Sequence, residues 1–213
     1  DHESKHPLTP LRAGLSTLSL TNLHERQQHL IQTMQTETLR LSRLVSDLRK
    51  LSDLEAQPLN LQLIHIESFI HELMQIERER FETEERQLTS QVEAGRSEWI
   101  VDEDLLTLAV HNLLDNAFKY TQPGDTVQLN VQAQTELVIR VTDNGRGIPS
   151  EALPHIWEEL YRAEQMQEKV SGSGIGLTLV KAIVERHGGK VSVNSEPGVE
   201  TAVSLTLPFI SPP

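Results

Sequence analysis

Asn112-Leu113-Leu114-Asp115-Asn116-Ala117-Phe118-Lys119-Tyr120 is the stretch of sequence that decides the fold. Read as a helix, it carries four side chains within roughly 100° of one another on one face: Asn112, Asn116, Lys119 and Tyr120. Apolar residues form a band beside and behind that face: Leu106, Ala109, Val110, Leu113, Leu114 and Ala117. Amides, an ammonium group and an aromatic ring along such an edge could hold a metal ion, a phosphate chain and a base. The pattern also fits a surface helix with polar residues at its boundary. The rest of the sequence is needed to choose between a ligand site and a surface helix.

Short alternating segments surround this helix from Pro58 onward. Strands are predicted near 59–63, 88–92, 99–101, 127–131, 137–141, 191–193 and 202–207. Helices are predicted at 67–86, after an Asp102 cap, at 151–161 and at 174–187. This order predicts an α+β sandwich, in which one mixed, mostly antiparallel sheet has helices on one face.

Two glycine-rich loops in this half could bind a ligand. Asp143 ends an apolar strand just before Gly145 and Gly147, where its carboxylate could accept a hydrogen bond from a ligand amino group or form a simple Asx turn. Gly172, Gly174 and Gly176, followed by Leu177, open a helix whose free N–H groups would attract an anion. The run is neither a dinucleotide fingerprint nor a Walker loop, because no strand runs straight into it and no Lys-Ser/Thr pair follows.

Residues 1–57 have a helical pattern with an apolar seam. Leu8, Leu11, Leu15 and Leu18 mark one helix, and leucines from Leu30 to Leu54, with Met34, mark a second. The seam is too long and thin to bury itself, so we expect two copies to pack as a four-helix bundle, which makes the chain a homodimer. A monomeric hairpin docked on the following domain is the alternative.

The start of this hairpin reads His2-Glu3-Ser4-Lys5-His6-Pro7-Leu8-Thr9. It could be a His-Glu-x-x-His zinc motif, but Pro7 disfavours helical geometry at His6. It could be two solvent-facing histidines near a helix start. It could also hold a nucleophilic His2, with Glu3 as the base that takes the proton of the other ring nitrogen.

Composition limits the class of protein. The 213 residues carry a formal net charge of −12, which argues against a nucleic-acid partner. The chain has no cysteine, which excludes disulfides, zinc-cysteine sites and cysteine nucleophiles. No apolar run approaches the roughly 18 residues needed to span a bilayer, so we expect no membrane contact in this fragment and a cytoplasmic location. The chain starts at Asp1, so it could be the soluble part of a longer, membrane-anchored sensor.

Taken together, the motifs resemble those of the sensor histidine kinases. Residues 112–120 resemble the family's Asn box, 143–148 its first glycine box and 172–177 its second, and His2-Glu3 with Pro7-Leu8-Thr9 resembles the phosphoacceptor box. Their order and approximate spacing agree over nearly the whole chain. The resemblance implies a dimerisation and histidine-phosphotransfer hairpin at 1–57, followed at 58–213 by a Bergerat-type ATP-binding domain.

The resemblance also implies roles for single residues. His2 would be the phosphoacceptor and Glu3 its general base. Asn116 would bind Mg²⁺, and the other ATP-binding residues would be Asn112, Lys119, Tyr120, Asp143, Gly145, Gly147, Gly172, Gly174, Gly176, Leu177 and Thr201. Lys169 or Arg162 would contact the γ-phosphate. The phosphoryl group would pass to an Asp of a response regulator receiver domain.

Four residues depart from the family pattern. His6 stands where Thr or Asn is usual, which puts phosphatase activity in doubt. Trp157 and Tyr161 replace a phenylalanine-rich box, and Glu200 stands where a second glycine is common. Two other functions stay open: an ATPase of the same fold that never phosphorylates itself, and a dimeric scaffold with a vestigial nucleotide site.

Overall fold

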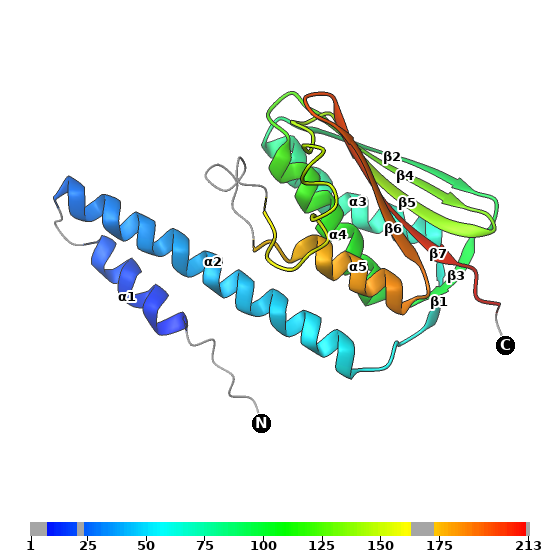
Figure 1. Ribbon diagram of the computed structural model, residues 1–213, viewed down its shortest axis with the longest axis horizontal. Coiled ribbons are helices and arrows are strands. Elements are labelled where there is room, and N and C mark those ends of the chain that lie inside the picture. The colour runs from blue at the N-terminus through cyan, green and yellow to red at the C-terminus, as the bar shows by residue number, and fades with distance from the viewer. Residues whose placement is uncertain (1–7, 21–23, 163–172, 212–213) are drawn as a thin grey trace.

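The computed structural model describes residues 8–20, 24–162 and 173–211. Two helices, α1 (Thr9–Ser19) and α2 (Glu25–Ala56), form an antiparallel hairpin that projects beside an α/β unit (Figure 1). Leucines on both helices remain exposed, including Leu11, Leu41 and Leu48. The two antiparallel helices confirm the predicted helical hairpin. Within the described ranges no helix has the length and apolar character needed to cross a membrane.

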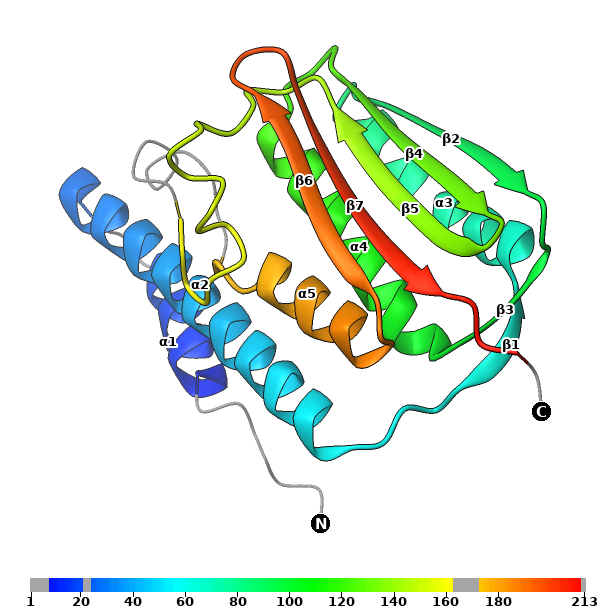
Figure 2. The ribbon, with the colours of Figure 1, turned by 45° about the vertical axis from the view of Figure 1, so that its right-hand side comes forward.

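The α/β unit is built on a five-stranded sheet with the order β2-β4-β5-β7-β6. The strands are β2 (Gln87–Ala94), β4 (Thr126–Ala133), β5 (Glu136–Asp143), β6 (Lys190–Glu196) and β7 (Glu200–Pro208). Only the β2–β4 pair is parallel. Three helices cover one face (Figure 2): α3 (Ile66–Thr83), α4 (Glu103–Tyr120) and α5 (Gly176–Arg186). This arrangement confirms the predicted α+β class.

The core lies between the sheet and these helices. Alternate residues of β4 and β5 are fully buried, as their period-two pattern predicts, including Val127, Leu129, Leu137 and Ile139. The apolar band of α4 packs onto them, and six of its residues are buried. Packing this band inward leaves one polar edge of α4 at the surface of the unit.

Two predicted elements differ from the structure. The expected strand at 59–63 starts only at Gln62, and β1 (Gln62–His65) pairs with β3 (Glu98–Val101) in a separate two-stranded sheet. The expected single sheet is therefore wrong. The backbone N–H of Asn60 donates to the carboxylate of Asp102, the N-cap of α4 (2.9 Å), so the segment before β1 lies at the start of that helix.

The helix expected at 151–161 is a run of turns. Its backbone hydrogen bonds join residues three apart, for example His155 to Ala152 and Glu158 to His155. Pro154 lacks an N–H group, and Leu160 has a positive φ of 63°, so a regular helix cannot continue through either residue. The segment instead forms an irregular wall beside α4.

Candidate nucleotide-binding site

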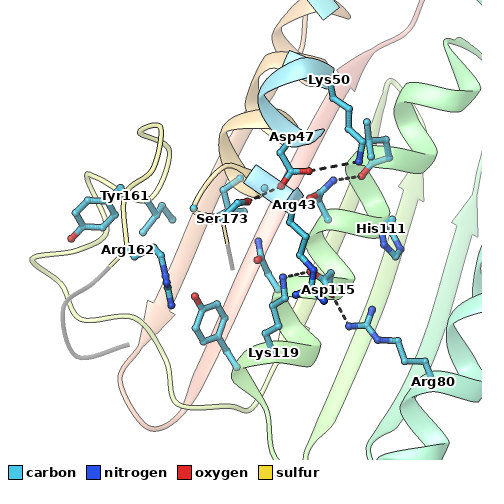
Figure 3. Close-up of a pocket in the computed structure, with 18 residues that line it drawn as sticks. Arg43, Asp47, Lys50, Arg80, His111, Asp115, Lys119, Tyr161, Arg162 and Ser173 are labelled. Carbon is cyan, nitrogen blue, oxygen red and sulfur yellow. Dashed lines mark hydrogen bonds and ion pairs between the residues drawn. The ribbon is translucent and has the colours of Figure 1, made fainter. Parts of the chain in front are cut away.

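The polar edge of α4 lines a cavity of about 460 Å³ between α2, α4 and the start of α5 (Figure 3). Asp102 caps the helix by accepting from the N–H of Leu105 (3.1 Å). The residues predicted from the Asn box all reach this cavity: Asn112, Asn116, Lys119 and Tyr120. Asn112, Asn116 and Tyr120 follow one another at intervals of about one helical turn, and Lys119 lies next to Tyr120. Their functional groups therefore form a continuous row.

Glycines bring the start of α5 against this row. Gly174 has a φ of +77°, which L side chains rarely adopt, and it ends the preceding loop. A Cβ on Gly176 would lie 3.0 Å from the amide oxygen of Asn112 and 4.0 Å from that of Asn116. The Asn112 amide nitrogen donates to the carbonyl of Leu108 (2.7 Å), and this bond turns its oxygen toward Gly176. Free N–H groups of a helix N-terminus and two amide oxygens thus meet at one point, which suits an anion with its cation.

A smaller, mostly apolar cavity continues inward from the same edge. It is lined by Leu113, Ala117, Tyr120, Val141, Asp143, Gly147, Ile148, Leu177 and Thr201, among others. Asp143 is only 6% exposed and accepts from the N–H of Gly145 (3.0 Å). Burial raises the pKa of Asp143 to about 6, an effect that the Gly145 hydrogen bond partly opposes. A single carboxylate in an apolar pocket is suited to accept a hydrogen bond from an amino group on a flat ligand.

Thr201 faces this carboxylate from the neighbouring strand. It pairs with Asp143 in the β5–β7 register and is 8% exposed. The Ser195 hydroxyl lies 3.0 Å from that of Thr201 and accepts from the N–H of Ile148 (2.9 Å). These bonds fix the loop after Gly147 against β6 and β7. The pocket floor is therefore held by the loop after β5 and by the β6–β7 hairpin, about 50 residues further along the chain.

The backbone after Asp143 needs its glycines. Gly147 has a φ of +70°, and a Cβ there would collide with the carbonyl of Glu196. A Cβ on Gly145 would collide with the carbonyl of Tyr120. The loop can close over the inner cavity only because both residues lack side chains.

Charged residues from three helices surround the outer cavity. The cations that line it within the described ranges are Arg43 and Lys50 from α2, Arg80 from α3, Lys119 from α4, and Arg162. Asp47 of α2 accepts from the Ser173 hydroxyl (2.7 Å), which joins the hairpin to the loop before α5. Burial raises the pKa of Tyr120, while nearby Arg162 and Arg146 oppose that rise. An excess of positive charge around a cavity favours phosphate groups.

Sequence reasoning missed Arg43, Asp47, Lys50, Arg80 and His111. All five line the outer cavity. Arg43, Asp47 and Lys50 belong to the hairpin, and only the packing of α2 near α5 brings them here. The sequence carries no local signal for them, because a charged residue on a predicted helix is ordinarily a solvated one.

A divalent cation would fit at Asn116. The described residues contain no cluster of three or more His, Cys, Asp or Glu that could hold a metal ion by itself. Mg²⁺ commonly takes one or two protein ligands and completes its shell with water and substrate phosphates. The Asn116 amide oxygen, close to the α5 start, could supply one such ligand.

Several predicted residues lie outside the described ranges. His2, Glu3 and His6 precede residue 8, and Lys169 and Gly172 fall between 162 and 173. Arg162, the other expected γ-phosphate contact, lines both cavities.

Two protein families and a known sensor kinase are similar to this chain. Residues 101–211 match the family described as "Histidine kinase-, DNA gyrase B-, and HSP90-like ATPase", and residues 1–57 match the "His Kinase A (phospho-acceptor) domain". The sensor protein kinase WalK of Staphylococcus aureus strain MRSA252 is 30% identical over 215 residues, which cover 97% of this chain and 35% of WalK. The chain thus spans about a third of the length of that relative.

Two solved structures share the fold. Full-length ShkA in complex with AMPPNP has a TM-score of 0.74 at 24% identity, over 96% of this chain and 44% of ShkA. Histidine kinase ThkA in complex with the response regulator protein TrrA has a TM-score of 0.71 at 15% identity, over 96% of this chain and 58% of that one. The chain belongs to the family of histidine kinase-, DNA gyrase B- and HSP90-like ATPases and, with a His Kinase A domain ahead of the ATPase fold, it is the catalytic core of a sensor histidine kinase.

Proposed function

We propose that the chain is an ATP-dependent protein histidine kinase that phosphorylates His2 and passes the phosphoryl group to an Asp of a response regulator. One observation carries the proposal. The Asn-box edge of α4, the buried Asp143 and the start of α5 line two adjoining cavities, one apolar and one cationic. A base and a phosphate chain need these two environments side by side.

The inner cavity would hold the adenine. Asp143 would accept from its exocyclic amino group, with Thr201 beside it and the Tyr120 ring against the base. Gly145 and Gly147 would shape the floor. Arg162, which lines both cavities, would lie where the base meets the phosphates.

The outer cavity would hold the phosphates. Their contacts would be Asn112 and Lys119 on α4 and the backbone of Gly172, Gly174, Gly176 and Leu177, with Lys169 or Arg162 at the γ-phosphate. Asn116 would hold Mg²⁺, which neutralises charge on the phosphates when bound. The AMPPNP named for ShkA supports nucleotide use by this fold.

In the reaction, one imidazole nitrogen of His2 would attack the γ-phosphorus. The new N–P bond forms as the bond from phosphorus to the β,γ-bridging oxygen breaks, and ADP leaves with that electron pair. Glu3 would take the proton from the other ring nitrogen. Positioning and charge neutralisation supply most of the rate in such transfers.

The hairpin at 1–57 would be the dimerisation and phosphotransfer domain, and 58–213 the ATP-binding domain. Exposed leucines on α1 and α2 support a dimer, since pairing would bury them in a four-helix bundle. The ThkA–TrrA complex supports a response regulator as the partner. With a net charge of −12, the chain has no favourable electrostatics toward nucleic acid.

Labelling with γ-labelled ATP and Mg²⁺, followed by mapping of the modified residue, tests the proposal. Label on His2 that is stable to base and labile to acid is expected, and His2→Gln should abolish it while ATP still binds. Asn116→Asp should remove Mg²⁺-dependent labelling. Stable label on another residue would make His2 the wrong acceptor, and ATP binding without any label would favour an ATPase of the same fold.

A further inference from the structure

A chain of charged side chains links α3 to the phosphate side of the cavity. Glu77 of α3 is 3% exposed, and one of its oxygens lies 2.6 Å from Nδ1 of His111. The other oxygen makes no hydrogen bond and lies 3.7 Å from Nη1 of Arg80, one turn further along α3. A buried carboxylate therefore lies within ion-pair distance of the Arg80 guanidinium.

Arg80 in turn holds Asp115. Its Nη2 lies 2.6 Å from Oδ1 of Asp115, and its guanidinium also stacks 4.0 Å from the centre of the Phe118 ring. The second oxygen of Asp115 pairs with the Lys119 ammonium, so one carboxylate is shared by two cations. Figure 3 shows both contacts, with Arg80 and Lys119 on opposite sides of Asp115.

This sharing matters because Lys119 would also have to bind the nucleotide phosphates. When a nucleotide phosphate draws the Lys119 ammonium away, the Asp115 carboxylate stays behind, partly buried and close to a second negative group. An uncompensated carboxylate there would both retain Lys119 and repel the phosphate. Arg80, paired with Glu77 and stacked on the Phe118 ring, neutralises Asp115 whether or not Lys119 is paired with it.

We propose that Arg80 is a positioning residue for ATP binding, which compensates the charge of Asp115 and so leaves Lys119 free to bind phosphate, with Glu77 orienting Arg80. The inference rests on the proposed nucleotide site and adds to it a residue from α3, a helix outside all the recognised motifs. Arg80 acts through Asp115 and is not required to contact the nucleotide.

Binding titrations of the full chain with ATP and with adenosine test this. Arg80→Gln should weaken ATP binding about tenfold and leave adenosine binding unchanged, since adenosine carries no phosphate. Adding Asp115→Asn should restore most of the lost ATP affinity, because the charge that Arg80 compensates is then gone. Arg80→Lys keeps the charge but loses the planar guanidinium that contacts Glu77, Asp115 and the Phe118 ring, so its ATP affinity should fall between those of Arg80→Gln and the unsubstituted chain. Arg78→Gln removes the same charge from an exposed position of the same helix and serves as the control.

The outcomes separate the inference from the proposed function. An unsubstituted chain that binds no ATP would overturn both. An Arg80→Gln chain that binds ATP normally, or that loses ATP and adenosine equally, would overturn the inference alone. Failure of Asp115→Asn to restore affinity would also overturn it, because Arg80 would then act directly. Should Arg80→Gln not fold, Asp115→Asn by itself is expected to tighten ATP binding two- to threefold or so, and weaker binding would contradict the charge argument.

Discussion

Replacing Asp143 with Asn should make the folded chain more stable at neutral pH and a poorer nucleotide binder. Burial raises the pKa of this carboxyl from 3.8 to about 6, so the folded state holds the proton more tightly than the unfolded chain does. The free energy of unfolding is therefore lowered as the pH rises from 3.8 to about 6. The difference between a pKa of 3.8 and one of about 6 corresponds to ~3 kcal/mol, an upper value for the cost of the charge at pH 7.5.

Asn removes that cost, since it is uncharged and its oxygen can still accept from Gly145. The stabilisation by Asp143→Asn, relative to the unsubstituted chain, should grow by ~2–3 kcal/mol between pH 4 and pH 7.5. The same change places an amide N–H where the free carboxylate oxygen was. ATP affinity at pH 7.5 should then fall about tenfold or more, because two donors would face each other.

Urea unfolding at the two pH values, at fixed protein concentration, measures the first effect. Tryptophan fluorescence reports on the α/β unit alone, because both tryptophans, Trp99 and Trp157, lie in it. Glu136→Gln removes a charge from an exposed position of the same strand and is the matched control. A stability difference for Asp143→Asn that is equal at both pH values would refute the burial argument.

Three further outcomes are expected. Gly147→Ala should lower the free energy of unfolding by about 1–3 kcal/mol, because its φ of +70° is strained for alanine and the methyl group meets the Glu196 carbonyl; an equally stable variant would contradict this. Arg186 donates to the carbonyl of Gln57 just past the end of α2, so Arg186→Ala should speed amide hydrogen exchange there, and Arg186→Lys should do so less. Leu41→Glu, at an exposed apolar position of α2, should convert a dimer into monomers by light scattering, whereas an unchanged mass would argue against the bundle.

Local patterns predicted most of the fold. Period-two alternation identified the strands at 127–131 and 137–141, and the apolar band from Leu106 to Ala117 identified the buried face of α4, because each pattern reflects a face that must be covered. The run at 151–161 was misread as a helix. Its apolar residues have helical spacing, but Pro154 interrupts the backbone ladder, and spacing alone does not register a missing N–H group.

The residues of the candidate site that were predicted are those that belong to short sequence motifs. Asn112, Asn116, Lys119, Tyr120, Asp143, Gly174 and Gly176 line the cavities or approach their walls. Each sits in a motif whose residue types and spacing already suggest a ligand. Their roles toward ATP and Mg²⁺ remain predictions.

The sequence by itself determined most of the elements, the order of the motifs and the polar edge of α4, because these depend on residues that are neighbours along the chain. Only the tertiary structure decided that α2 brings Arg43 and Lys50 to the outer cavity, and that Arg80 of α3 pairs with Asp115 of α4. Such contacts join residues tens of positions apart. They follow from how helices pack on the sheet and on each other, and no local pattern encodes which charged side chain then faces a cavity.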